Sequence, residues 1–315
     1  MDPAIVIFGF GIGALVGMTG MGGGTLMTPL LIFLFGIKPV TAIGTDIFYA
    51  AVTKTVGGWR HLRMGTVNMK LAYWLAAGSV PAAVAGVWVI SILQDRIGEE
   101  ELDSIVYALL GGTLLMVGII TLARALILSN LIEEREDFVM QRRHKVAAVV
   151  IGATTGFVIG ITSAGSGTVI AILLIAIYRL TPQRVVGTDV FHAAILLWAA
   201  GIAHWVGGNV DFMLAGNILL GSVPGVIVGA QFASKAPTSF LRTALGVVLI
   251  ASGIVTVQKG DPVVWPIAAV VAGIGLGLLI WFPRWWNERR VKREAAEAKK
   301  QGEDRSDDLT PDVIG

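Results

Sequence analysis

Long apolar runs without charge constrain this chain more than any other feature of its sequence. Residues 71–93 and 212–233 contain no Lys, Arg, Asp or Glu, and several other segments are nearly as apolar over similar lengths. A helix of about 20 apolar residues is long enough to cross the hydrocarbon core of a bilayer. A buried helix in a soluble domain rarely needs that length. The runs therefore predict an all-α polytopic membrane protein.

The composition points in the same direction. Hydrophobic residues make up 55% of the chain and charged residues only 15%, with a mean hydropathy of +0.75. Soluble domains are about 45–50% apolar and about 25% charged, so lipid is the expected surroundings of the excess apolar surface. Cysteine is absent, which excludes disulfides, thiolate metal sites and cysteine nucleophiles.

Apolar runs and charge clusters divide the chain into segments. We expect a first transmembrane repeat at 1–128, a cytoplasmic linker at 129–145, a second transmembrane repeat at 146–258, an additional transmembrane helix at 259–283, and a basic then disordered cytoplasmic tail at 284–315. Basic residues concentrate in the tail, the linker and the loop at 59–70, which predicts a cytoplasmic position for all three. The expected location is a bacterial inner (plasma) membrane.

An internal repeat with a constant offset of 143 residues indicates the architecture. The segment 17–25, GMTGMGGGT, aligns with 160–168, GITSAGSGT, and GTDIFYAA at 44–51 aligns with GTDVFHAA at 187–194. GSVP recurs at the same offset, and His61 aligns with His204. Shared membrane composition does not explain an ungapped match of this kind.

Charge predicts that the two repeats have opposite orientations. The segment that carries His61 is basic and is expected in the cytoplasm, whereas the segment that carries His204 has no Lys or Arg and is expected outside. We therefore predict two inverted-topology repeats, each a glycine-broken helical hairpin plus three spans, followed by one extra C-terminal span. Inverted repeats that meet near the midplane are a design of secondary transporters.

The glycine clusters admit several interpretations. A phosphate loop would require a lysine after the glycines, and a dinucleotide fold would require alternating strands and helices; the sequence shows neither. In a bilayer, a glycine-rich break can direct free amide groups at an anion, or it can let two helices approach closely. On the first interpretation, the candidate substrate-binding residues are Gly22, Gly23, Gly24, Thr25, Thr45, Gly165, Ser166, Gly167, Thr168 and Thr188.

Ionisable residues inside apolar segments are candidates for proton coupling. Asp46 and Asp189 each follow Gly-Thr near the start of a span, where a carboxylate costs several kcal/mol and is by default a candidate for a functional role. The alternative is that each caps a helix N-terminus. His61 and His204 could titrate near neutral pH, or they could be interface residues. Lys54 is the least expected cation, because Leu197 occupies the equivalent position in an apolar span.

The duplicated glycine motif followed by Pro29, together with the paired GTD and GSVP segments, resembles the TauE/SafE family of sulfite exporter-like permeases over about residues 4–257. The second motif departs from the first, because Ser163 replaces Gly20 and Ile172 stands where Pro29 does. The resemblance implies transport of sulfite, a sulfonate or a related small anion, coupled to protons.

These observations together predict a secondary transporter that works by alternating access, and not an enzyme. The alternatives are an anion channel and a permease for carboxylates or other organic anions. The expected partners are a small anion, protons and the lipid bilayer. We expect no cofactor, no metal and no nucleic acid, and the sequence favours no particular oligomeric state.

Overall fold

Helices joined by short connections make up the described part of the chain. The computed structural model describes residues 2–19, 24–126, 140–165, 167–233, 238–273 and 276–277. The helices are α1 (Pro3–Thr19), α2 (Gly24–Phe35), α3 (Pro39–Arg63), α4 (Met69–Ile97), α5 (Glu99–Leu126), α6 (Arg142–Thr162), α7 (Thr168–Leu173), α8 (Pro182–Val206), α9 (Phe212–Ala233) and α10 (Thr238–Lys259). A π-helical turn (Leu174–Tyr178) follows α7, and a 3₁₀ turn (Pro262–Val264) follows α10.

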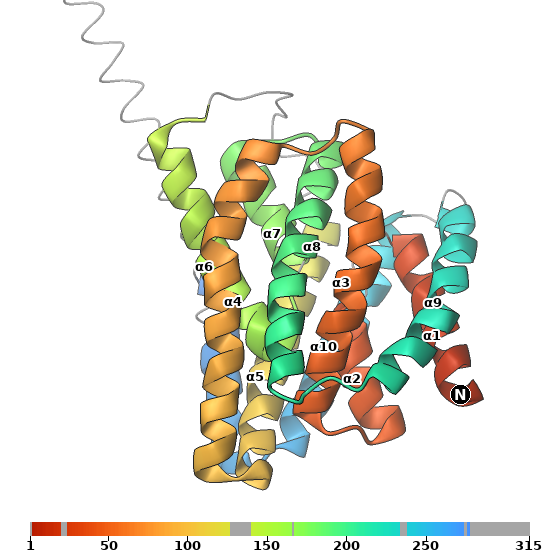
Figure 1. The fold of residues 1–315 in the computed structure, drawn as a ribbon, viewed down its shortest axis with the longest axis vertical. Coiled ribbons are helices and arrows are strands. Elements are labelled where there is room, and N and C mark those ends of the chain that lie inside the picture. Colours follow the sequence, from red (N-terminus) through yellow and green to blue (C-terminus); the bar gives the residue numbers. More distant parts are fainter. Residues whose placement is uncertain are drawn as a thin grey trace, which may run out of the picture.

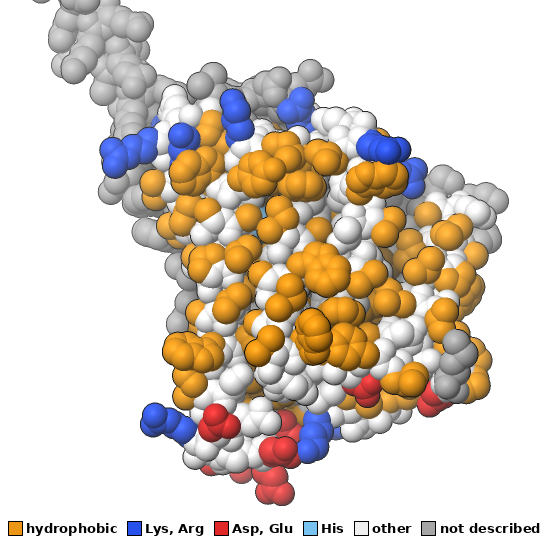
Figure 2. Space-filling model, in the orientation of Figure 1, with side chains coloured by type: hydrophobic (Ala, Val, Ile, Leu, Met, Phe, Trp, Pro, Cys, Tyr) orange, Lys and Arg blue, Asp and Glu red, His pale blue; other side chains and the backbone are white. Residues whose placement is uncertain are grey.

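The expected all-α polytopic class is confirmed. Within the described residues, five helices, namely α4, α5, α6, α8 and α9, are long and apolar enough to cross a membrane. Figure 2 shows apolar side chains over the middle of the molecule, Lys and Arg at the end where α4 begins, and Asp and Glu among the charges at the opposite end. At that second end the exposed Lys38 forms an ion pair with Glu99, whose hydrogen bond raises the pKa of Lys38.

The same local signals begin and end the equivalent helices of the two halves. Proline lies in the first turn of α3 and of α8. The N–H groups of a first turn have no acceptor within the helix, so the missing N–H of proline costs no hydrogen bond there. Asn68 accepts a hydrogen bond from Leu71 N–H at the start of α4, and Asp211 accepts one from Leu214 N–H at the start of α9. These caps occupy positions 143 residues apart.

The helix is interrupted at both glycine motifs. Helix α1 ends at Thr19 and α2 begins at Gly24, and the residues between them lie outside the described part of the chain. Helix α6 ends at Thr162 and α7 begins at Thr168. In the second interruption Ser163, Gly165 and Gly167 have φ of 59°, 98° and 101°. Glycine adopts this left-handed region without steric cost, whereas serine does so less readily.

Helices from the two halves pack against each other in reciprocal pairs. Helix α1 packs along α9, and α6 packs along α4. A Cβ atom added at Gly78 of α4 would lie 2.1 Å from the carbonyl oxygen of Val149, and one added at Gly221 of α9 would lie 1.9 Å from that of Val6. Gly78 and Val149 are equivalent to Gly221 and Val6 at the 143-residue offset. The α4–α6 pair and the α9–α1 pair therefore form the same close backbone contact, each between a helix of one half and a helix of the other.

Helices α3 and α8 lie side by side and run in opposite directions (Figure 1). They occupy equivalent places in the two halves. The two GTD segments, which are 143 residues apart in the sequence, lie about two turns inside these helices.

Helix α3 continues to Arg63, so the prediction of a loop at His61 is wrong. Basic residues in the last turn suit the partial negative charge of a helix C-terminus, which explains the longer helix. The tail at 284–315 and linker residues 129–139 lie outside the described residues.

Replacing Gly78 by alanine should destabilise the protein. The added Cβ would meet backbone atoms of α6 that a side-chain rotation cannot move away, and such overpacking costs about 1–3 kcal/mol. The melting temperature of the purified protein in detergent should therefore fall. Gly11→Ala is the matched control, because nothing lies within 4 Å of a Cβ there. Equal melting temperatures for the two variants would contradict the close α4–α6 contact.

Candidate functional site

Asp46 lies at a point where elements of both halves meet. It is fully buried on α3. Its Oδ2 accepts one hydrogen bond from Thr28 Oγ1 of α2, at 2.6 Å, and another from Ser163 Oγ of the α6–α7 connection, at 2.5 Å. Its second oxygen, Oδ1, is buried and has no hydrogen-bond partner in the structure. The carboxyl group therefore joins the hairpin of the first half to the helix break of the second.

Asp189 occupies the equivalent position on α8 but has different surroundings. It is 4% exposed, and its Oδ1 has no hydrogen-bond partner among the described residues. The positions equivalent to Thr28 and Ser163 hold Ala171 and Gly20, so the pair of hydroxyl donors has no counterpart here. Asp189 instead lies within electrostatic reach of Lys54 on α3. The two halves therefore share a carboxyl position and differ in what surrounds it.

Neither aspartate caps its helix. The N-cap positions of α3 and α8 are Lys38 and Thr181, and both aspartates lie two turns further along. The capping alternative is therefore wrong for Asp46 and for Asp189. Two buried carboxyl groups inside apolar helices need another explanation, since a membrane interior disfavours charge there.

Thr45 and Thr188 connect the two halves through a reciprocal pair of hydrogen bonds. Asp211 N–H donates to Thr45 Oγ1 at 3.0 Å, and Asn68 N–H donates to Thr188 Oγ1 at 2.9 Å. Both hydroxyl groups thus accept from the residue that caps a helix of the other half. Helix starts carry backbone N–H groups without intrahelical partners, so these bonds satisfy donors that lipid would leave unpaired.

The two histidines predicted to take part in proton coupling, His61 and His204, lie in different surroundings. His204 is fully buried, and its Nε2 lies 2.9 Å from the carbonyl oxygen of Gly160, to which it donates. His61 is partly exposed, and its Nδ1 lies 3.0 Å from Thr66 Oγ1. Both histidines therefore lie in the last turn of their helices, α8 and α3, but His204 is buried against α6 and His61 is partly exposed.

His192 is a buried polar residue that the sequence reasoning missed. Its Nε2 lies 2.8 Å from Ser79 Oγ of α4, and its Nδ1 has no hydrogen-bond partner in the structure. The equivalent pair is Tyr49 and Ser222, which also lie near each other. The signal was present in the repeat, because the aligned segments place a polar aromatic ring at both positions.

Some of the predicted anion-binding residues of the helix breaks lie within the described part of the chain. Thr25 and Thr168 are buried in the first turns of α2 and α7. Gly165 and Gly167 shape the second break, and Gly24 begins α2. The remaining three candidates, Gly22, Gly23 and Ser166, lie outside the described residues.

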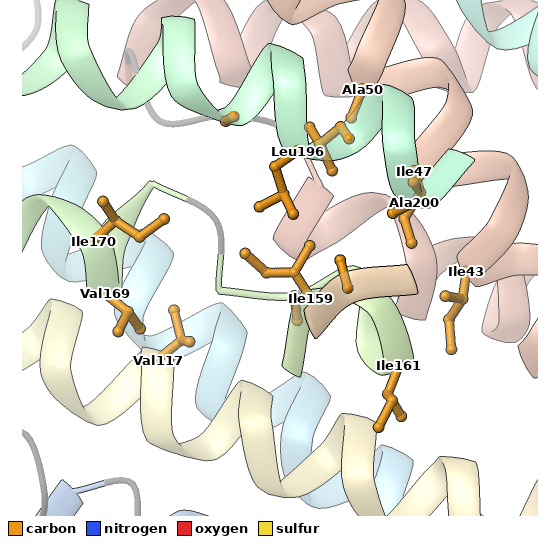
Figure 3. Close-up of a cluster of buried hydrophobic side chains, with 14 of the residues drawn as sticks. Ile43, Ile47, Ala50, Val117, Ile159, Ile161, Val169, Ile170, Leu196 and Ala200 are labelled. Atoms are coloured by element: carbon orange, nitrogen blue, oxygen red, sulfur yellow. The ribbon is translucent and has the colours of Figure 1, made fainter. Parts of the chain in front are cut away.

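Apolar side chains surround the polar groups. Figure 3 shows Ile43, Ile47 and Ala50 of α3 together with Leu196 and Ala200 of α8, the helices that carry the two aspartates. Charges interact more strongly in such surroundings than in water. A change of protonation or the arrival of an ion at Asp46 or Asp189 therefore has a large effect on the free energy of the site.

A separate cavity of about 760 Å³ lies between α4, α5 and α6 and reaches the second break at Ala164 and Gly165. Its lining is apolar, and the hydroxyl groups of its threonines, Thr113, Thr154 and Thr155, donate to carbonyl oxygens of their own helices. The cavity therefore offers an anion few donors. Among the described residues, no group of three or more His, Asp or Glu side chains is arranged to hold a metal ion.

Apolar helices that are interrupted at two glycine motifs, with ionisable residues between the two halves, are typical of an integral membrane protein of the transporter class. The sequence matches the sulfite exporter TauE/SafE family over residues 5–256. The chain therefore belongs to this family, as the motifs predicted.

Several curated relatives support this assignment. A protein from Bacillus subtilis (strain 168), named probable membrane transporter protein YjnA, is 37% identical over 81% of this chain and 99% of its own length. A second protein of that organism, probable membrane transporter protein YdhB, is 27% identical over 76% of this chain and 94% of its own. Probable membrane transporter protein MJ0441 from Methanocaldococcus jannaschii is 27% identical over 60% of this chain and 66% of its own. No solved structure gives a significant match.

Replacing Thr188 by valine should lower stability. The change keeps the side-chain shape but leaves the N–H of Asn68 without its acceptor, and an unsatisfied buried donor costs about 1–3 kcal/mol. The melting temperature in detergent should fall accordingly. Thr154→Val is the control, because that hydroxyl is exposed and bonds only within its own helix; its effect should stay within about 0.5 kcal/mol. An unchanged Thr188→Val protein would show that the reciprocal bond is not needed.

Proposed function

We propose that this protein is a secondary transporter that carries sulfite, an organosulfonate or a similar small anion together with protons, by alternating access. The observation that carries the proposal is the position of Asp46, whose carboxyl group accepts hydrogen bonds from Thr28 of one half and Ser163 of the other. The description of its family, sulfite exporter, supports the substrate class.

Asp46 is suited to carry a proton. A buried carboxylate in apolar surroundings is expensive unless paired, and its Oδ1 has no partner in the structure. Burying the protonated carboxyl group costs less free energy than burying the ionised one. Uptake of a proton by Asp46 therefore stabilises the closed site. Because its two hydroxyl partners belong to opposite halves of the molecule, any movement of one half against the other changes the environment of the carboxyl group. Proton binding and conformation are thereby linked.

The helix breaks supply donors for the anion. The first amide groups of α2 have no intrahelical acceptors, and the N-terminal end of a helix attracts negative charge. Gly22, Gly23, Gly24 and Thr25 would contribute from the first motif. From the second motif Gly165, Ser166, Gly167 and Thr168 would do so.

An ionised Asp46 beside the second break would repel an anion there. The anion therefore binds next to the protonated carboxyl group, which makes cotransport of an anion and a proton the favoured mode. His204, which is buried in the last turn of α8 and bonds to the carbonyl group of Gly160 in α6, and His61 in the last turn of α3 would pass protons to Asp46 and Asp189. Thr45 and Thr188 would then act by holding the halves in register around the site.

Replacing Asp46 by asparagine should abolish accumulation driven by a pH gradient. Asparagine can still receive the hydrogen bonds of Thr28 and Ser163 through its carbonyl oxygen, but it cannot carry a proton. In proteoliposomes with a pH gradient, uptake of methanesulfonate and of sulfite should fall by at least about tenfold, the factor that corresponds to 1.4 kcal/mol.

The exposed Asp95 offers a matched control, and Asp95→Asn should accumulate the anions as the wild type does. Methanesulfonate keeps its charge at every pH of the assay, so its accumulation reports coupling and not protonation of the substrate. Wild-type flux that ignores the pH gradient would contradict coupled transport and indicate a channel. Full gradient-driven accumulation by Asp46→Asn would exclude Asp46 as the proton carrier.

A further inference from the structure

A second cluster of buried polar groups lies between α3 and α8. It consists of Lys54 of α3 and of Asp189 and His192 of α8, which are 7%, 4% and 0% exposed. One polar atom of each has no hydrogen-bond partner in the structure, namely Lys54 Nζ, Asp189 Oδ1 and His192 Nδ1. Lys54 lies within electrostatic reach of both α8 side chains. Three buried polar groups, each with an atom that lacks a hydrogen-bond partner among the described residues, thus lie near one another between α3 and α8.

Lys54 and Asp189 do not form an ion pair. No contact within 4.0 Å joins their charged atoms, and the ion pair found among the described residues is the exposed one of Lys38 and Glu99. A buried ammonium group without a partner is costly. It is stabilised by an anion that accepts its hydrogen bonds, so the cluster has the properties of a binding site.

The fold does not require a cation at this position. Leu197 is equivalent to Lys54 in the other half and is 1% exposed. The corresponding α3–α8 contact therefore forms with an apolar side chain. The imidazole of His192 is likewise replaced by Tyr49 at the equivalent position. The cluster joins α3 of the first half to α8 of the second, and the repeat-equivalent set, Leu197, Asp46 and Tyr49, lacks the cation and the imidazole, as expected for a function and not for a packing need.

We propose that Lys54, His192 and Asp189 form an anion site that binds a small, singly charged oxyanion, such as a sulfonate, together with one proton. This inference rests on the proposed function and adds to it a second position for the anion, apart from the helix breaks.

The chemistry of the three groups explains why a proton accompanies the anion. Lys54 contributes the positive charge. When Ser79 donates to His192 Nε2, the ring carries its hydrogen on Nδ1, which then donates to the anion. Ionised Asp189 repels the anion, whereas protonated Asp189 donates a hydrogen bond to it. Binding of the anion therefore favours uptake of one proton by Asp189.

The site lies toward one end of the molecule. Lys54 is eight residues beyond Asp46 on α3, a separation of about 12 Å along the helix. It lies nearer to the helix end that carries Arg60 and Arg63. An anion that passes between this basic end and the helix breaks meets the buried Lys54 on one side of Asp46, whereas Lys38, at the same separation on the other side, is exposed and paired with Glu99. An anion that enters from the basic end therefore meets a buried cation before it reaches Asp46, and an anion that enters from the other end does not.

Lys54→Leu tests the site by copying the residue of the other half. In titrations of the purified full-length protein with methanesulfonate, the variant should bind at least about tenfold more weakly than the wild type, a factor that corresponds to 1.4 kcal/mol. Its melting temperature without ligand should stay equal or rise, because an unpaired buried charge has been removed. Lys70→Leu removes the same charge from an exposed position and should bind as the wild type does.

Further variants separate charge from folding. Lys54→Met keeps the length of the side chain and should lose affinity like Lys54→Leu, whereas Lys54→Arg should retain most of it. Wild-type affinity for methanesulfonate should increase as the pH is lowered, because the protonated form of Asp189 binds the anion. Asp189→Asn, which provides an amide donor without titrating, should bind it with little dependence on pH.

The outcomes distinguish this inference from the proposed function. Wild-type binding that is unchanged in Lys54→Leu or Lys54→Met overturns the site, and leaves transport through the helix breaks intact. A full pH dependence in Asp189→Asn overturns the role of Asp189. A wild-type protein that neither binds nor transports sulfite, sulfate, thiosulfate, sulfonates or carboxylates overturns the proposed function, and the inference with it.

Discussion

A bilayer offers a broken helix no hydrogen-bond partner, and this constraint governs the arrangement of the whole molecule. Backbone that leaves the helical conformation at membrane depth must be enclosed by protein or face a polar cavity. The interruption between α6 and α7 meets this requirement because α3 lies against it and Asp46 accepts the hydroxyl hydrogen of Ser163. The halves cannot be separated without exposing such groups, so their contact is part of the fold itself.

Reciprocal contacts show how the halves depend on each other. The hydroxyl groups of Thr45 and Thr188 each accept the capping-residue N–H of a helix in the opposite half. Glycines such as Gly78 and Gly221 allow α4 and α9 to approach α6 and α1 until backbone touches backbone. Close approach through small residues is how helices associate where lipid provides no hydrophobic drive. Both interpretations of glycine, packing and helix breaking, therefore apply, but at different glycines.

Departures from the repeat identify where chemistry differs between the halves. Ser163 stands where the first motif has Gly20, and it is a donor to Asp46. Lys54 stands where the second half has Leu197, and it lies near Asp189. One carboxyl group is thus surrounded by hydroxyl donors and the other by a cation and an imidazole. Because an anion and a proton make opposite demands on a charged site, a division of these tasks between the halves is physically reasonable.

The sequence by itself determined the helical membrane class, the family, the 143-residue repeat and the recurrence of the GTD segments, because hydropathy, glycine clusters and repeated motifs are local patterns. It pointed to Asp46, Asp189 and Lys54 as charges out of place in apolar helices, but it left capping open for the aspartates. Only the tertiary structure decided that both lie two turns inside their helices, that Asp46 faces Thr28 and Ser163, and that His192 belongs to the same region as Lys54. The contacts of Asp46 with Ser163 and of Lys54 with the α8 side chains join residues more than 100 positions apart, and a linear pattern carries no information on which helix faces meet across the molecule.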